Sequence, residues 1–440
     1  MKLQRTLGTL GLVFVLFFCT SGGAFTTETL VVAVGPGLAL AILVAVPILW
    51  SLPEVLIIGE LASMLPEEGG YYKWVRRAFG PFWAFQNAWL TWMYSLVDMA
   101  LYPVLFNQYL AYFVPGLGWS ARLAISLAVI WTATAVNLRG ARPVGRVSIV
   151  TGSFIILGFV ALSIAAVPHM THAPWMPFAK GGQGTFGAIG VGLSLALWNY
   201  TGWDNASPVQ GEVRDASRTY PRALAFGLPL VMLGYLLPLA TTLGASDWTT
   251  WHEGGWSDIA RASAGAFGPL LATWIGLAGL VSALALFNAL LLAYSRVPLA
   301  MANDGLLPRF LAQTDARGTP VNSVLASAVC YSVFAMLPLQ KLVVADVFLY
   351  ALALFLEFGA LVVLRQREPE LRGAFRIPVG TAGVVALAAL PVAILLVVLG
   401  LETQDPEFGL PAVVGSLAAI AFGPVAYLLA RRFVAPSPAA

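Results

Sequence analysis

The stretch FFCTSGGAFTTETL, residues 17–30, interrupts an apolar run that would otherwise be typical of one long helix. Ser21, Gly22 and Gly23 break the run, and the chain then becomes apolar again while carrying a carboxylate at Glu28. A break of this kind needs an explanation, because glycines and a charge are both unfavourable inside an apolar helix. The explanation depends on the environment in which the helix lies.

Composition identifies that environment. The 440 residues are 59% hydrophobic and 10% charged, and their mean hydropathy is +0.82, so too little polar surface exists to cover a soluble protein. Runs of roughly 20 apolar residues recur, which is the length that crosses a bilayer as a helix. Segments such as LAISLAVIWTATAV are apolar all round, which excludes the alternation of a membrane barrel. We expect an all-α integral membrane protein.

The first apolar run is expected to stay in the mature protein. Lys2 and Arg5 precede it, as in a signal peptide, but Phe17 and Phe18 stand where a signal peptidase requires small side chains. Both cysteines, of which Cys19 is one, lie in apolar segments and predict neither a disulfide framework nor a metal site.

Twelve transmembrane helices are predicted, at residues 7–34, 38–64, 81–113, 121–137, 144–167, 185–208, 222–244, 267–303, 322–338, 342–364, 377–400 and 409–430. Of the 24 Lys and Arg, all but Arg122, Lys180, Arg261 and Lys341 fall on one side of this arrangement. The excess of positive charge places that side, and with it both termini, in the cytoplasm. The net charge of +3 then describes a surface facing anionic lipid and does not predict nucleic acid as a partner.

A second break repeats the first. In LSLALWNYTGWDNASPVQGE, residues 193–212, the sixth span is apolar up to Trp198 and then offers Asn199, Gly202 and Asp204. Two interrupted helices five spans apart predict an inverted 5+5 repeat with two additional helices. A packing kink is the plainer alternative, but two breaks at matching positions favour a binding site, in which freed backbone groups, as at Gly202, and polar side chains, such as Asn199, meet a substrate.

The two breaks would offer different chemistry. Backbone N–H groups after Gly23 can hold a carboxylate, whereas carbonyl groups that end the half-helix near Trp198 can hold an ammonium group. Glycine lets a ligand approach the backbone closely. Spans 1 and 6 are therefore predicted to form the centre of a substrate site.

Four stretches together resemble the amino acid/polyamine/organocation (APC) transporter superfamily. They are TSGGAF (20–25), ELASMLPEEGGYYKWVRRAFGPFWAFQNAW (60–89), YTGWDNASPVQGEVRDASRTYPRAL (200–224) and SRVPLAMANDGLLPRFLAQTDARGTP (295–320). The resemblance implies a LeuT-type fold, a substrate bound between spans 1, 3, 6, 8 and 10, and alternating access. Within the superfamily the chain is most similar to the polyamine-uptake and cationic amino acid permease branch.

The resemblance also assigns roles to single residues. Ser21, Gly22 and Gly23 match the cradle for a substrate carboxylate, and Trp198 matches an aromatic lid. Asp98 lies where relatives place polar residues of the third span that contact the substrate. Two features depart from the pattern: the eighth span lacks the acidic residues expected of a polyamine carrier, and the fifth lacks the lysine that replaces sodium in some relatives.

Charges inside a membrane are costly, so Glu28, Glu54, Asp98 and Asp204 each need a role. All four are candidates for proton coupling or for binding a substrate amine. Each also has a plainer interpretation: an internal hydrogen bond for Asp98, bracing of the broken helix for Asp204, a protonated and packed side chain for Glu54, and exposure to an outer vestibule for Glu28.

Two other groups of polar residues have simple explanations. Glu60, Glu67 and Glu68 are expected near the inner surface, as solvated charges or a cytoplasmic gate. His169 and His172 form a loop pair that is expected to be solvated, and no H-E-x-x-H motif occurs, so no metal site is predicted.

The longest external connection, residues 245–266, is rich in tryptophan and predicts a short helix at the membrane interface.

The sequence therefore predicts a secondary active transporter that takes up amino acids or polyamines across the cell membrane, driven by a proton gradient and without a cofactor. Sodium coupling, exchange, and a neutral amino acid permease remain alternatives. An ion channel would need polar rings along a pore, and an enzyme would need a catalytic cluster. We expect a division into residues 1–178 (first repeat), 179–366 (second repeat) and 367–440 (two further helices). The sequence gives no oligomeric state.

Overall fold

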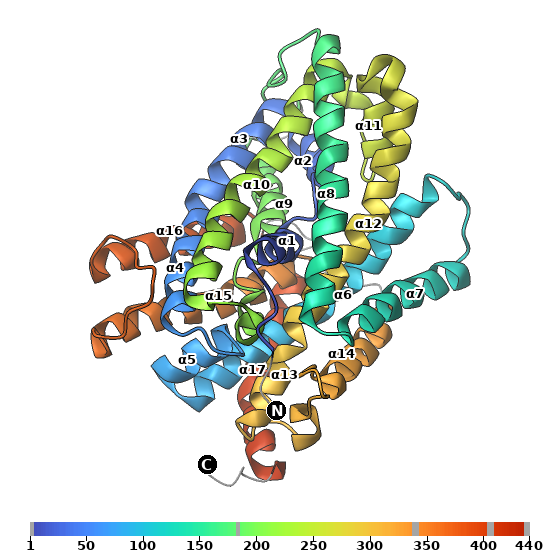
Figure 1. The fold of residues 1–440 in the computed structure, drawn as a ribbon. Helices are drawn as coiled ribbons and strands as arrows, with labels where there is room; N and C mark the ends of the chain where they lie inside the picture. Colours follow the sequence, from blue (N-terminus) through green and yellow to red (C-terminus); the bar gives the residue numbers. More distant parts are fainter. Residues whose placement is uncertain (1–3, 182–184, 337–342, 403–408, 435–440) are drawn as a thin grey trace.

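The computed structural model describes residues 4–181, 185–336, 343–402 and 409–434. Within these ranges the chain is helical, and a single β-bridge between Leu7 and Val213 is the only strand-like pairing. The predicted all-α class is confirmed. Figure 1 shows the helices packed as one bundle, with both ends of the chain at the same end of it.

The first part of the bundle contains the first break. Its elements are α1 (Thr9–Thr20), α2 (Thr27–Val34), α3 (Pro36–Val46), the π-helix η1 (Pro47–Ser51), α4 (Leu52–Met64), α5 (Tyr71–Phe79), α6 (Pro81–Ala111), α7 (Trp119–Asn137), α8 (Ala141–Ala166) and η2 (Val167–His169). The segment between α1 and α2 is the predicted interruption.

The second part contains the second break, between α9 and η3. Its elements are α9 (Thr185–Tyr200), η3 (Ser207–Glu212), α10 (Ala216–Ala245), η4 (Trp248–Thr250), α11 (Trp256–Ser263), η5 (Gly265–Phe267), α12 (Gly268–Tyr294), α13 (Arg296–Asn303), η6 (Arg309–Ala312), α14 (Val321–Phe334) and α15 (Val343–Arg367). The helices α16 (Thr381–Glu402) and α17 (Gly409–Phe433) follow.

The breaks arise where the backbone leaves the helical region. Gly22 and Gly23 have φ of 71° and 116°, and Gly202 has φ of 102°, and residues with a Cβ atom rarely adopt such backbone angles. The helix α1 therefore ends at Thr20, and α9 ends at Tyr200. Glycine thus fixes both interruptions at the places where the sequence predicted them.

Eight helical segments of the described chain are long and apolar enough to cross a membrane. The sequence ranges of the other four predicted spans overlap α6, which is more polar, and three shorter apolar helices, Thr9–Thr20, Ile189–Tyr200 and Val321–Phe334. Large apolar side chains such as Val150 and Phe226 are 70% and 65% exposed, as expected of a lipid-facing surface. These features make the protein an integral, multi-pass membrane protein.

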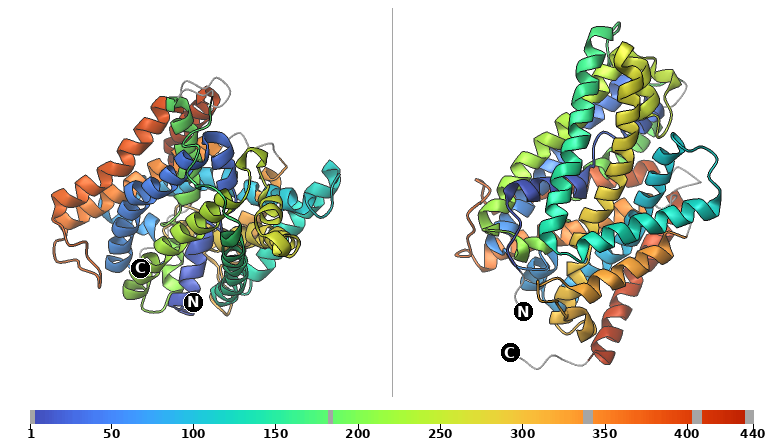
Figure 2. Two further views of the ribbon diagram at one scale, coloured as in Figure 1. Left: turned by 90° about the horizontal axis from the view of Figure 1, so that it is seen from above. Right: turned by 45° about the vertical axis from the view of Figure 1, so that its right-hand side comes forward.

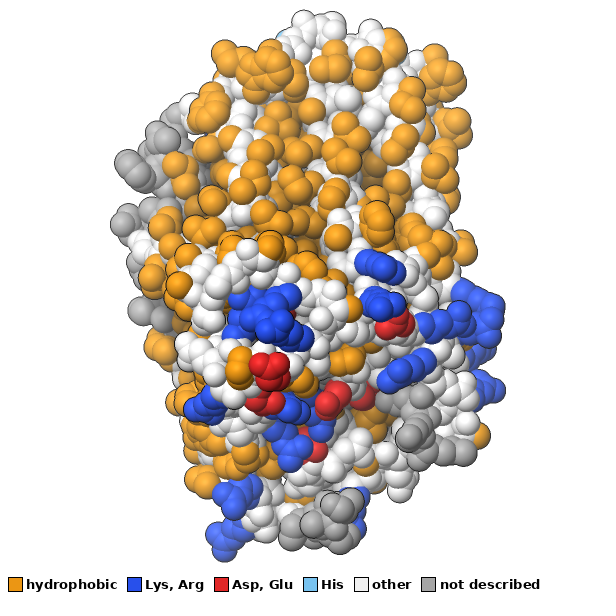
Figure 3. Space-filling view, turned by 60° about the vertical axis from the view of Figure 1, so that its left-hand side comes forward, with side chains coloured by type: hydrophobic (Ala, Val, Ile, Leu, Met, Phe, Trp, Pro, Cys, Tyr) orange, Lys and Arg blue, Asp and Glu red, His pale blue; other side chains and the backbone are white. Residues whose placement is uncertain are grey.

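Charge is distributed unevenly along the bundle. On the face shown in Figure 3, Lys and Arg side chains gather toward the end where the termini lie, and the opposite part of that face is mostly hydrophobic. Lys341, one of the four basic residues predicted for the other side, lies outside the described residues. This distribution matches the asymmetry on which the predicted orientation depends.

Packing places both breaks in the interior. The helix α12 packs against α6, α7, α8 and α1, while α9 packs against α2, α3, α15 and α16. Figure 1 shows α1 between α8 and α10, with which it packs, and Figure 2 shows the same bundle from two further directions. The ends of the broken helices are consequently shielded from lipid, as unpaired backbone groups in a membrane require.

The tryptophan-rich connection at residues 245–266 packs partly into the bundle. It does form a short helix, α11, but Trp256 is fully buried and its indole Nε1 donates to the carbonyl oxygen of Ala24 at 2.9 Å. The indole thus bonds a carbonyl group of the first break, so α11 is tied to the segment between α1 and α2.

Candidate substrate site

A cavity of about 40 Å³ lies where the two breaks meet. The first break contributes Ser21 to its lining, and the second contributes Trp198, Asn199 and Thr201. The two breaks are bonded directly, since Thr26 Oγ1 donates to Oδ1 of Asn199 at 2.8 Å. The structure thus brings predicted residues from positions about 180 apart to one place.

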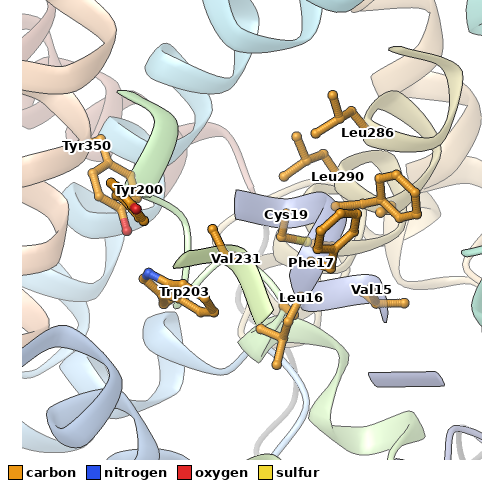
Figure 4. Packing of buried hydrophobic residues seen from close by; sticks show 14 of the residues in the cluster. Val15, Leu16, Phe17, Cys19, Tyr200, Trp203, Val231, Leu286, Leu290 and Tyr350 are labelled. Carbon is orange, nitrogen blue, oxygen red and sulfur yellow. The ribbon is translucent and has the colours of Figure 1, made fainter. Parts of the chain in front are cut away.

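Gly202 lets the second break approach the end of α1 closely. A Cβ atom at this position would lie 2.3 Å from the carbonyl oxygen of Cys19, so only glycine lets the second break touch the end of α1. Its N–H donates to the hydroxyl of Tyr350 at 2.8 Å. In the close-up of Figure 4, Tyr200, Trp203 and Tyr350 gather on one side, opposite Cys19. The Gly202 N–H is therefore engaged within the protein.

Gly22 and Gly23 lie beside the cavity, and their N–H groups already have partners. The Gly22 N–H donates to the Phe17 carbonyl at 3.1 Å, and the Gly23 N–H donates to Oγ of Ser21 at 3.1 Å. The Ser282 hydroxyl donates to the Gly22 carbonyl at 2.6 Å. A substrate carboxylate could bind the Gly23 N–H only by displacing its bond with Ser21, whereas a substrate without a carboxylate would leave the turn intact.

Two carboxylates line the cavity. Asp98, on α6, accepts from the hydroxyls of Tyr102 at 2.5 Å and Tyr294 at 3.2 Å. Asp346, near the start of α15, is 5% exposed and its Oδ1 has no hydrogen-bond partner. None of the described residues that line the cavity is Lys, Arg or His. Because buried carboxylates without a positive partner are costly, this cavity is suited to a cation.

Glu54 and Asp204 meet beside the cavity. The hydroxyl oxygen of Tyr350 lies 2.6 Å from Oε1 of Glu54 and 2.6 Å from Oδ1 of Asp204. The N–H of Trp203 also donates to Oε1 of Glu54 at 3.0 Å. Tyr350 itself lines the cavity, so these acidic groups adjoin the site through one side chain.

Glu28 lies elsewhere. It is fully buried at the start of α2, and its Oε1 accepts from the N–H of Gly254 at 2.9 Å, which ties the external connection to the first broken helix. It is not among the described residues that line the cavity. Of the four predicted intramembrane carboxyls, Asp98 lines the cavity, Glu54 and Asp204 adjoin it, and Glu28 is separate from it.

Sequence reasoning missed several residues of the site. Asp346 was detectable, because it is an acidic residue at the start of the apolar run at 342–364. The hydroxyls of Tyr102, Tyr294 and Tyr350 gave no such signal, since tyrosine is common in membrane helices for reasons of packing alone. Their role depends on which helices face one another.

The fold and the site first define a class. Helices that break beside a buried polar cavity, inside an all-helical membrane bundle, are typical of secondary transporters. Comparison with known proteins agrees: the family model described as amino acid permease matches residues 7–417. The chain is 38% identical to "Polyamine transporter PUT1" of Oryza sativa subsp. japonica over 422 residues, which covers 95% of this chain and 77% of the relative.

Two further relatives extend the comparison. "Polyamine transporter RMV1" of Arabidopsis thaliana is 36% identical over 417 residues, covering 94% of this chain and 83% of the relative. "Branched-chain amino acid permease BcaP" of Lactococcus lactis is 24% identical over 318 residues, covering 67% of each chain.

The chain belongs to the amino acid permease family of the APC superfamily. The predicted similarity to the polyamine-uptake branch is confirmed. The protein is therefore a permease, and the prediction that it is not an enzyme is confirmed by its family.

Proposed function

We propose that this permease transports polyamines, and that the cation binds in the cavity at the two breaks. The observation that carries the proposal is the pair of carboxylates, Asp98 and Asp346, in a cavity whose described lining includes no basic residue. A diamine or polyamine has at least two ammonium groups and no carboxylate, so it matches two acidic side chains and leaves the turn at Gly23 undisturbed. The names of the plant relatives support the same substrate class.

Each predicted substrate-binding residue receives a role in this proposal. Asp98 binds an ammonium group, Asn199 offers its amide and carbonyl oxygens, and Trp198 covers the methylene chain and the cation. Ser21 lines the cavity from the first break. Gly22, Gly23 and Gly202 shape the backbone around the substrate.

Transport is proposed to proceed by alternating access and to be coupled to protons. Glu54 and Asp204 adjoin the cavity and, in the described chain, have no basic partner, which supports a proton as their counter-charge. Sodium remains the competing coupling ion.

The topology is proposed to have twelve spans in a LeuT-type arrangement. The first repeat comprises residues 1–178 and the second comprises 179–366, with residues 367–440 forming the two additional helices. The meeting of the two breaks supports this division, since inverted repeats place discontinuous helices at their interface. The basic end of the bundle supports cytoplasmic termini in a cell membrane.

Uptake by proteoliposomes tests the proposal. Radiolabelled putrescine, spermidine, arginine and leucine are compared with and without an inward proton gradient. We expect putrescine and spermidine to accumulate, more strongly with the gradient, and leucine to remain near the level of empty liposomes. Accumulation of leucine without either polyamine would contradict the proposal and favour a neutral amino acid permease.

A further inference from the structure

Three buried residues from three parts of the fold meet at the side-chain hydroxyl oxygen of one of them, Tyr350. Tyr350, on α15, has its hydroxyl oxygen 2.6 Å from a carboxyl oxygen of Glu54, on α4, and 2.6 Å from a carboxyl oxygen of Asp204, in the second break. The Gly202 N–H donates to the same hydroxyl oxygen at 2.8 Å. Both oxygen–oxygen distances are in the range of hydrogen bonds in which one partner is charged.

These contacts need more hydrogen atoms than the tyrosine hydroxyl supplies. A phenolic hydroxyl has one hydrogen to donate and two lone pairs with which to accept. The Gly202 N–H occupies one lone pair, so one carboxyl oxygen can receive the hydroxyl hydrogen and the other must donate to the remaining lone pair. A carboxyl group can donate only when it is protonated.

In the part of the chain that the structure describes, no positively charged group faces the carboxyl groups of Glu54 and Asp204. The titratable groups that face the three residues are Tyr71 on α5, Tyr94 on α6, Tyr220 on α10, Glu357 on α15 and Cys19 on α1, with Asp98 and Asp346 around the cavity. None of these is a base that would be positively charged. In addition, Oε2 of Glu54 is buried without a hydrogen-bond partner. Two ionised carboxylates on one hydroxyl would repel each other in a low-dielectric interior, which favours one bound proton.

We propose that Glu54, Tyr350 and Asp204 hold one shared proton, and that this proton fastens the second break to α4 and α15. The inference rests on the proposed transport function and names the site of its coupling proton. Because Tyr350 lines the cavity, its hydroxyl can release a hydrogen to water there as it takes the proton of the carboxyl group, so that each O–H bond broken is matched by one formed. Two carboxylates then compete for one hydroxyl hydrogen, and one contact between the break and its neighbours is lost.

Infrared spectroscopy of the purified protein without substrate tests whether one proton is shared by these residues. A protonated carboxyl has a C=O stretch that a carboxylate lacks. We expect one such band at neutral pH to be lost in both Glu54→Gln and Asp204→Asn, because each variant leaves one carboxylate that takes the tyrosine hydrogen. Glu357→Gln, a buried carboxyl two helical turns from Tyr350, is the matched control and should keep the band.

Three results would overturn the proposal: no band that depends on these residues, loss in Glu54→Gln alone, or a separate band lost in each variant. Tyr350→Phe provides a second readout, since removing the bridging oxygen should shift the frequency of the band and the pH at which it disappears. An unchanged band in Tyr350→Phe would also contradict the bridge. Because no substrate is present, these outcomes do not depend on whether the protein transports polyamines.

Transport tests the coupling role separately. Uptake by Glu54→Gln and Asp204→Asn in proteoliposomes should no longer respond to an imposed pH gradient, whereas Glu357→Gln should respond as the wild type does. A wild-type response in both acidic variants would remove the coupling role from this site.

Discussion

Gly202 is the residue at which the two broken helices touch. Its φ of 102° and the 2.3 Å that would separate an added Cβ from the Cys19 carbonyl oxygen leave no room for a side chain. Because the obstacle is backbone, it cannot move aside as the end of a flexible side chain can. The contact therefore sets the distance between the two sides of the cavity.

Gly202→Ala should accordingly destabilise the protein and disable transport. The unfavourable φ alone costs about 1–3 kcal/mol, and the clash with Cys19 adds to it. Gly234→Ala is the control: this glycine lies inside α10, where an added Cβ meets nothing within 4 Å, and alanine should be neutral or stabilise by roughly 0.5–1 kcal/mol. Thermal unfolding in detergent measures both. Equal stability of the two variants would refute the close approach.

Trp198 is the residue proposed to cover the cation. An aromatic ring over a desolvated cation is worth on the order of 0.5–2 kcal/mol, so Trp198→Leu should weaken the apparent affinity for putrescine about threefold to thirtyfold. Trp83→Leu, at a tryptophan that is 46% exposed on the outside of the bundle, is the control. An unchanged affinity in Trp198→Leu would assign this residue to packing.

At the scale of elements, buried ion pairs hold the helices together near the end with the termini. Arg365 of α15 donates to Glu60 of α4 through Nε at 2.7 Å and Nη2 at 2.5 Å, and both side chains are 2% exposed or less. Arg296 of α13 is also buried and donates to Glu212 of η3, but through Nε alone, at 2.8 Å. Glu60 is therefore not one of the solvated charges that the sequence allowed.

The pair of Glu60 and Arg365 can be compared with an exposed pair in the same region. Arg77 and Glu368 are 2.6 Å apart, with side chains 45% and 34% exposed. Glu60→Gln leaves a buried charge without its partner and should lower the free energy of unfolding by about 3–5 kcal/mol. Glu368→Gln should cost about 1 kcal/mol or less. Chemical unfolding of both variants checks this difference, and similar losses would show that burial is not what makes the first pair matter.

The elements also show which predictions the sequence could support. Glycine at 22, 23 and 202 marked both breaks, because a backbone conformation leaves a local signature. The long apolar runs predicted the helices for the same reason, since an apolar run is also a local feature of the sequence. In contrast, the meeting of Glu54, Asp204 and Tyr350 depends on how α4 and α15 pack around a break 150 residues away from each. Tertiary packing of this kind has no local pattern, so it could not be predicted.

For the whole molecule, the small cavity indicates a closed state. A volume of about 40 Å³ holds only a few water molecules, so a polyamine requires the bundle to open. A second cavity of about 830 Å³ lies between α6, α7, the end of α14 and the connection before α11, and includes Glu253 and Asp258 in its lining. The proposed substrate site is thus a separate cavity from this larger one, since the two share no lining residue.

Cys19 reports on the opening, because it lines the small cavity and is 5% exposed. In a Cys330→Ala background it is the single remaining thiol of two. A small thiol reagent should label Cys19 slowly, and putrescine should slow the labelling further at concentrations that saturate transport. Leucine is the control and should not protect. If putrescine left the labelling rate unchanged, the cavity would not be the binding site.

The most direct test of the central claim is equilibrium binding of radiolabelled putrescine to the purified protein and to two variants, Asp98→Asn and Asp346→Asn. Each change keeps the size of the side chain and removes one charge from the cavity. We predict that each weakens putrescine binding tenfold or more, about 1.4 kcal/mol per decade, while both variants keep wild-type melting temperatures. Wild-type affinity in both folded variants would contradict the account, because the carboxylates would then have no part in recognising the substrate.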